Sequence, residues 1–203
     1  MELTAVFETW HIGDGNYPPL KKGMPVNLSF QIEPDQLGVI EAPAAQRFDH
    51  IGLGNYRFVG KVIRIYNDND SSERIAVIDA NEFRFYVQSP LAAKCGLGHH
   101  VAGVGTLVLD YYGWVEFLPE YTDPPDLFYK LRVERIRRLQ MPEKFINRSR
   151  ASVSYPSRLA PQDYESVDLT EVDLIEDESF VCFIVDFSDS NVPPGPLPRT
   201  FRT

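Results

Sequence analysis

The sequence predicts an all-β protein, a barrel or sandwich of about nine strands, from the period of its apolar residues, its β-branched and aromatic runs and its scarcity of helical pattern. In residues 26–32 (VNLSFQI) apolar and polar side chains alternate, as expected for a half-buried strand. Residues 82–88 and 129–134 alternate in the same way. We expect the apolar side chains of these three segments to share one core.

Further strands are indicated by β-branched and aromatic runs bounded by turn residues. These runs are residues 3–10, 57–66, 74–78, 101–109, 112–118 and 180–187. One short helix is predicted after Ser89, a suitable N-cap, with Gly96 as its stop signal. Residues 39–48 are a second, weaker helix candidate.

The order of elements over residues 57–138 resembles the OB-fold, a five-stranded barrel with a short helix between its third and fourth strands. The resemblance concerns architecture, and no residue motif accompanies it. We therefore expect an OB-like portion at about residues 57–138 within the larger β-structure. Two glycines of this portion, Gly103 and Gly105, lie in a run that continues as a strand. They predict a bulge or a tight bend, because a phosphate-binding loop requires a helix directly after its glycines.

Length and composition are typical of one globular domain. The chain has 203 residues, 43% of them hydrophobic and 24% charged. We expect residues 1–190 to form a single β-rich domain and residues 191–203 to form a Pro-rich C-terminal tail. No run approaches the ~18 apolar residues that span a bilayer, so a soluble, cytoplasmic protein without membrane contact is expected. Cys95 and Cys182 lack metal-binding spacing, predict buried reduced thiols, and no cofactor is indicated.

Net charge constrains the partners. The formal net charge is −9, which disfavours non-specific nucleic-acid binding, because that binding depends on Lys and Arg neutralising phosphates. Residues 162–179 carry eight acidic residues and no basic one, and we expect them to form a loop or short helix. An acidic surface is suited to a basic protein partner.

An internal repeat is the most unusual feature of the sequence. Residues 11–17 (HIGDGNY) and 50–56 (HIGLGNY) match at six of seven positions. The structural interpretation is two similar turns, in which both glycines adopt positive φ, the asparagine tolerates the left-handed region, and the tyrosine anchors the turn on the core. The functional alternative is a shared small-molecule or metal site. Its candidate residues are His11, Asp14, Tyr17, His50, Asn55 and Tyr56.

Other candidate chemistry is weak. A metal at the repeat would need a third ligand, and the counterpart of Asp14 is Leu53, so we assign no metal. His99 and His100 are adjacent on a predicted strand and point to opposite faces, which is unfavourable for chelating one ion. A Cys95 pair with either histidine has no flanking motif to support it. The sequence thus favours a non-catalytic protein over an enzyme.

One basic stretch, residues 130–150, is the alternative nucleic-acid site. Exposed aromatic and basic side chains there suit an OB-type groove for single-stranded nucleic acid. The candidate residues are Phe128, Lys130, Arg132, Arg135 and Arg137. The competing interpretation is that the acidic segment 163–178 folds back and neutralises this stretch.

Three hypotheses follow from these observations. The first is a non-catalytic protein that binds another protein through an acidic surface, similar in charge and size to inhibitor or immunity proteins. The second is an OB-type binder of single-stranded nucleic acid. The third is a small-molecule or metal site at the paired turns.

Overall fold

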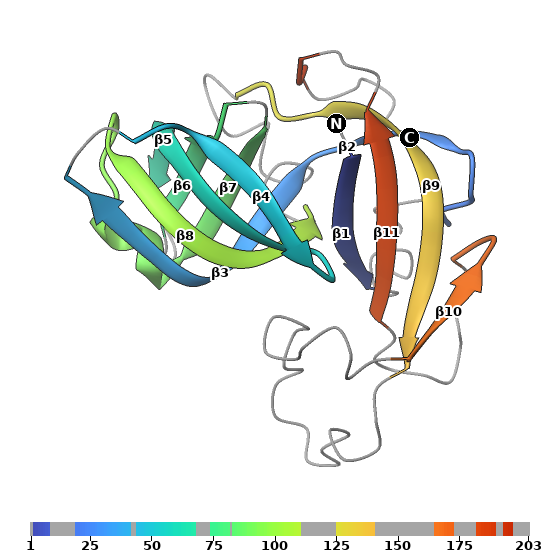
Figure 1. Cartoon of the computed structure of the whole chain (residues 1–203). Helices are drawn as coiled ribbons and strands as arrows, with labels where there is room; N and C mark the ends of the chain where they lie inside the picture. Colours follow the sequence, from blue (N-terminus) through green and yellow to red (C-terminus); the bar gives the residue numbers. More distant parts are fainter. Residues whose placement is uncertain are drawn as a thin grey trace.

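The computed structural model describes residues 2–8, 19–41, 44–67, 74–81, 83–110, 125–140, 165–172, 182–189 and 193–196. These residues form eleven strands, joined in one sheet, and one short 3₁₀ helix, so the all-β prediction is confirmed. The central strands of the sheet close into a barrel, and the remaining strands extend from it (Figure 1). None of the described helical residues forms a segment long and apolar enough to cross a membrane.

Five strands close the barrel in the order β3-β7-β6-β5-β8 and back to β3. Neighbouring strands are antiparallel except β3 and β7, which are parallel. The strands are β3 (Phe30–Ile40), β5 (Asn55–Asn67), β6 (Arg74–Asp79), β7 (Arg84–Ser89) and β8 (His100–Leu109). β4 (Arg47–Gly52) pairs with β5 outside this ring.

The barrel therefore coincides only in part with the expected block 57–138. It begins at Phe30, and its helix, η1 (Pro90–Lys94), lies between the fourth and fifth strands rather than the third and fourth. β9 (Tyr129–Gln140) does not pair with a barrel strand. Its partners are β2 (Pro25–Leu28), β10 (Glu165–Leu169) and β11 (Cys182–Asp189).

A second group of strands continues the sheet from β8. β1 (Glu2–Glu8) meets β8 in parallel at Val6 and Val108, and it pairs along its whole length with β11. β11 pairs with β9, and β9 with β10 and β2. The first and the last of the described strands are therefore direct neighbours, and β1 and β11 lie side by side in Figure 1.

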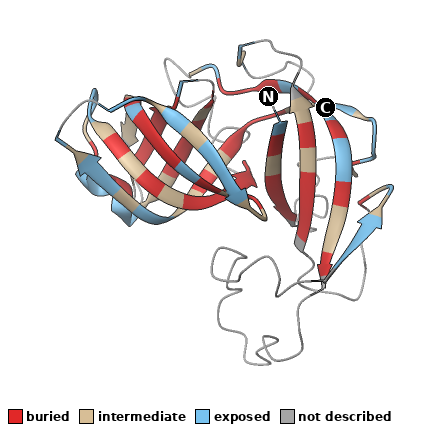
Figure 2. Cartoon of the chain, viewed as in Figure 1, coloured by how far each residue is buried: buried red, intermediate tan, exposed pale blue. Residues whose placement is uncertain are grey.

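The barrel and this second group share one hydrophobic core. Phe30 lies at the centre of it, with its ring 5.7 Å from Phe83 of the barrel, 6.3 Å from Tyr129 of β9 and 6.0 Å from Phe187 of β11. The same cluster contains Leu131, and Val26 packs against it. The three alternating segments of the sequence thus share one core, as expected (Figure 2).

Two glycines of β8 allow it to approach β3 closely. A Cβ atom on Gly105 would lie 2.3 Å from the backbone oxygen of Glu33, and one on Gly103 would lie 2.6 Å from that of Gln36. β3 changes register between Pro34 and Gln36, directly opposite these glycines. The predicted bulge is therefore confirmed. Side chains at these positions would force the strands apart.

Two local predictions were wrong. Residues 39–48 are not a helix: β3 runs to Ile40 and β4 starts at Arg47. The acidic segment contains a strand, β10. It pairs antiparallel with β9, and this pairing places the Asp168 carboxylate beside Arg135. The predicted helix after Ser89 is confirmed as η1, with the Ser89 hydroxyl accepting from Leu91 N–H. Residues 112–118 and most of the tail 191–203 lie outside the described residues.

Candidate functional site

The second copy of the repeat forms the turn between β4 and β5. Three consecutive residues have positive φ: Gly52 at 114°, Leu53 at 48° and Gly54 at 79°. The predicted use of both glycines is confirmed for this copy, since L-residues rarely adopt these angles. The left-handed role predicted for the asparagine was wrong, because Leu53 takes it. Asn55 lies in β5 and accepts a hydrogen bond of 2.8 Å from the Thr106 hydroxyl.

This turn attaches the barrel to β1. Tyr56 is 2% exposed, and its hydroxyl accepts a hydrogen bond of 2.8 Å from the backbone N–H of Thr4. Gly54 sits so close to β1 that a Cβ atom there would be 3.2 Å from Val6 Cγ2. The predicted anchoring by tyrosine is confirmed. Burial raises the pKa of Tyr56 to about 12, so it stays a neutral hydroxyl at physiological pH.

A half-buried ion pair lies beside the turn. Arg137 Nη2 of β9 is 2.6 Å from Asp186 Oδ1 of β11, and the side chains are 19% and 26% exposed. The Thr4 hydroxyl also donates to Asp186, at 2.8 Å. His50 lies within electrostatic range of both charges, and its ring centroid is 5.0 Å from that of Tyr56. The structure thus brings residues of the two separately predicted sites, the turn and the basic stretch, to one junction.

His50 is predicted to make the fold sensitive to acid. Desolvation lowers its pKa, and Asp186, which acts in the opposite sense, does not compensate. The folded protein therefore binds this proton less readily than the unfolded chain, whose histidine has a pKa of about 6.5. Stability is expected to fall as the pH decreases below that value, until the folded-state pKa is passed.

Denaturant unfolding at about pH 7.5 and pH 5 measures this effect. The stability difference between the two conditions should be smaller in His50→Gln than in the unmodified protein, because glutamine does not titrate. Equal pH dependence in both proteins would show that other groups cause the acid sensitivity.

The basic stretch is arranged on one face of β9. A bulge at Glu134 shifts the register so that Arg132, Arg135 and Arg137 all face the same side of the sheet. Their partners alternate along one face of β11: Ser188, Asp186 and Ile184.

These three arginines form hydrogen bonds or ion pairs with other residues of the chain. Arg135 forms two hydrogen bonds with Asp168 of β10, of 2.7 and 3.1 Å, and the first cause of the lowered pKa of Asp168 is this contact. Arg137 is paired with Asp186, and Arg132 donates to the carbonyl of Gly23. Of these contacts, the one between Arg135 and Asp168 supports the interpretation that the acidic segment folds back on the basic stretch.

Phe128 and Lys130 differ in exposure. Phe128 is only 4% exposed, and its backbone forms two hydrogen bonds with Gly195, so its ring is not available for stacking on a base. Lys130 is exposed on β9. The groove expected for a nucleic acid therefore lacks its aromatic component at this position.

The structure describes only three of the six residues proposed for a ligand or metal site. His11, Asp14 and Tyr17 lie outside the described residues. Within the described ranges, no group of three or more His, Cys, Asp or Glu is placed to hold a metal ion.

The residues around η1 have structural contacts. Cys95 is a buried free thiol, and burial raises its pKa, while the Arg74 guanidinium donates to the Cys95 carbonyl. His99 Nδ1 accepts from the backbone N–H of Gly96. The ring of His99 is thereby oriented toward the loop backbone.

One buried polar cluster has no sequence motif that could have predicted it. Asp110 is fully buried and accepts hydrogen bonds from the Ser29 hydroxyl at 2.9 Å and the Tyr86 hydroxyl at 2.5 Å. Tyr86 also contacts Gln31 Oε1 at 3.0 Å. Ser29 directly precedes β3 and Asp110 directly follows β8, so this cluster holds together the two points where the chain joins the barrel.

Comparison with known proteins adds no relationship. No family model matches the chain, and no curated protein or solved structure is similar to it. A function is therefore argued from the arrangement of the residues alone.

Proposed function

We propose that the chain is a non-catalytic binding protein that engages a basic partner protein through its acidic segments. The observation that carries this proposal is the distribution of charge. The chain has 29 Asp and Glu against 20 Lys and Arg, an excess of nine, and eight of the acidic residues lie in residues 162–179, which hold no basic residue.

Several arginines of the barrel and its attached strands already pair with carboxylates of neighbouring strands. Arg84 is paired with Asp79, Arg135 with Asp168, and Arg137 with Asp186. Excess carboxylates that have no balancing cations nearby in the sequence raise the rate and specificity of association with a positively charged protein. The densest group is residues 173–178, with four acidic residues in six.

Neutralising that group tests the proposal. The variant changes Asp173, Glu176, Asp177 and Glu178 to the corresponding amides. The control changes four exposed acids of the described residues by the same net charge: Glu2, Asp35, Glu41 and Asp126. Both immobilised proteins are then exposed to a lysate of the native host at about 50 mM salt.

We expect the first variant to lose at least one basic protein that the unmodified chain and the control both retain, and we expect salt to release it. If both variants retain the same proteins as the unmodified chain, the acidic segments do not determine binding and the proposal fails.

A single-stranded nucleic-acid ligand has less support. It would use Lys130 and Arg132, which are both exposed, without an aromatic contribution from the buried Phe128. A salt-dependent complex with oligo-dT, lost on changing Lys130 and Arg132 to glutamate, would favour this alternative.

A further inference from the structure

β4 is an edge strand of the sheet. Among the described strands it pairs only with β5, so no described strand takes up the backbone groups of its other edge. Four of its six residues are exposed, and Figure 2 shows the strand largely in the exposed colour along the barrel. An exposed edge of this kind pairs readily with another strand unless its side chains prevent it.

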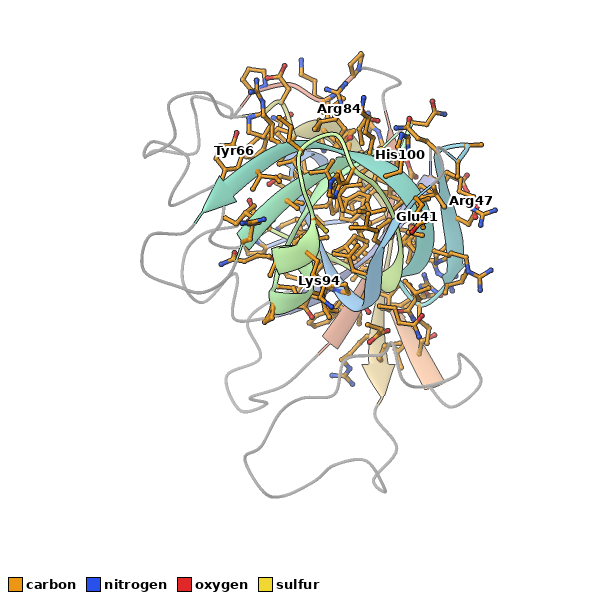
Figure 3. All side chains as sticks on the ribbon, turned by 90° about the vertical axis from the view of Figure 1, so that its left-hand side faces the viewer. Glu41, Arg47, Tyr66, Arg84, Lys94 and His100 are labelled. Carbon is orange, nitrogen blue, oxygen red and sulfur yellow. The ribbon has the colours of Figure 1, made fainter. Side chains whose placement is uncertain are left out.

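The charged side chains of β4 do not prevent this edge from pairing with a second copy of the strand. Arg47 and Asp49 lie two positions apart and pair across the sheet with Val59 and Arg57, so both face the outside of the barrel. Figure 3 shows Arg47 at the outer side of the barrel wall. Their side chains are 57% and 53% exposed and 3.5 Å apart. Like charges would repel a second copy, whereas a pair of opposite sign on either side of Phe48 is complementary to itself.

We propose that β4 pairs with β4 of a second copy of this chain, antiparallel, with Phe48 opposite Phe48. Each Arg47 then lies opposite the Asp49 of the other copy, which gives two ion pairs related by the twofold axis.

Other registers are disfavoured. A shift of one position places the inward Phe48 opposite the outward Asp49, and directly paired residues must share a face. A shift of two positions places Asp49 opposite Asp49, or Arg47 opposite Arg47, and like charges directly opposite are destabilising. The charge pattern therefore selects one register.

The dimer is expected to be weak and reversible. Six residues form a small interface, and specific interfaces that bury less than about 1,200 Å² belong to transient complexes. Sedimentation velocity of the full chain should show monomer at about 5 µM and an increasing fraction of dimer toward about 500 µM, decreasing with salt.

Charge reversal provides the decisive test. Arg47→Asp carries two acids on the edge and Asp49→Arg carries two bases, so each variant alone should dimerise at least tenfold more weakly. An equimolar mixture of the two should restore dimerisation, because each copy then meets the opposite charge at both positions. The control is Lys94→Asp, which makes the same change of charge at an exposed residue of η1, away from β4, and it should dimerise as the unmodified chain does.

Arg47 and Asp49 are exposed, so we do not expect their replacement to prevent folding. Thermal unfolding of each variant verifies that it is folded. A chain that stays monomeric at about 500 µM overturns the proposal. Unchanged dimerisation of the single variants, or a mixture that does not restore it, overturns it equally.

Discussion

Replacing Gly105 by alanine is expected to destabilise the folded protein by about 3 kcal/mol, although it adds only one methyl group. The new Cβ atom would lie 2.3 Å from the Glu33 carbonyl oxygen and 2.8 Å from Pro34 Cα, both of them backbone atoms of β3. A flexible side chain could move away, but here the two strands must separate where the barrel is closed. Denaturant unfolding followed by circular dichroism measures the loss.

Gly38 provides the matched control. It lies on β3 opposite Ala102, and a Cβ atom there would meet nothing within 4 Å. Gly38→Ala should be neutral or should stabilise the protein by up to about 1 kcal/mol, because it reduces the freedom of the unfolded chain. Similar losses of stability in both variants would mean that the strand propensity of the residue, and not the close approach of β3 and β8, determines the effect.

Truncating Phe30 is expected to cost about 3–5 kcal/mol and to destabilise both halves of the molecule together. Its ring contacts Phe83 in the barrel and Tyr129 and Phe187 in the strands beyond it. Removing the ring leaves a cavity between the two groups of strands. Native-state hydrogen exchange should therefore show a comparable loss of protection in β6 and β9 of Phe30→Ala.

The control for Phe30 is Val39→Ala on the same strand, where the side chain is 43% exposed and the loss should remain within about 0.5 kcal/mol. Loss of protection confined to the barrel strands in Phe30→Ala would show that the two groups unfold separately and that the shared core does not couple them.

The strands that sequence patterns predicted have either a period-two apolar face or a run of β-branched and aromatic residues. Residues 83–87 and 129–134 became β7 and β9 because their inward residues meet one core. β4 was not predicted, since its outward positions carry Arg47 and Asp49 and only Phe48 packs inward. The barrel block was misplaced for a related reason: period two identifies a strand but does not identify its neighbour.

The repeat predicted the turn and its tyrosine anchor, because glycine and tyrosine act through local geometry and size. The contacts that surround the turn could not be found in the same way. Thr4 and Asp186 are 182 residues apart, and Arg137 and Asp186 are 49 apart. Neither separation leaves a local pattern, and the pairing follows only once β1, β9 and β11 are adjacent.

The pairing of β1 with β11 also determines when folding can be completed during synthesis of the chain. β1 is made before the other described strands, and its antiparallel partner β11, which sets Glu2 against Ser188, is made after them. The barrel strands, residues 30–109, are all available much earlier and can close while β1 still lacks that partner. A nascent chain arrested before residue 182 is therefore expected to expose one edge of β1 to other proteins, and a chaperone that covers single strands would act in that interval.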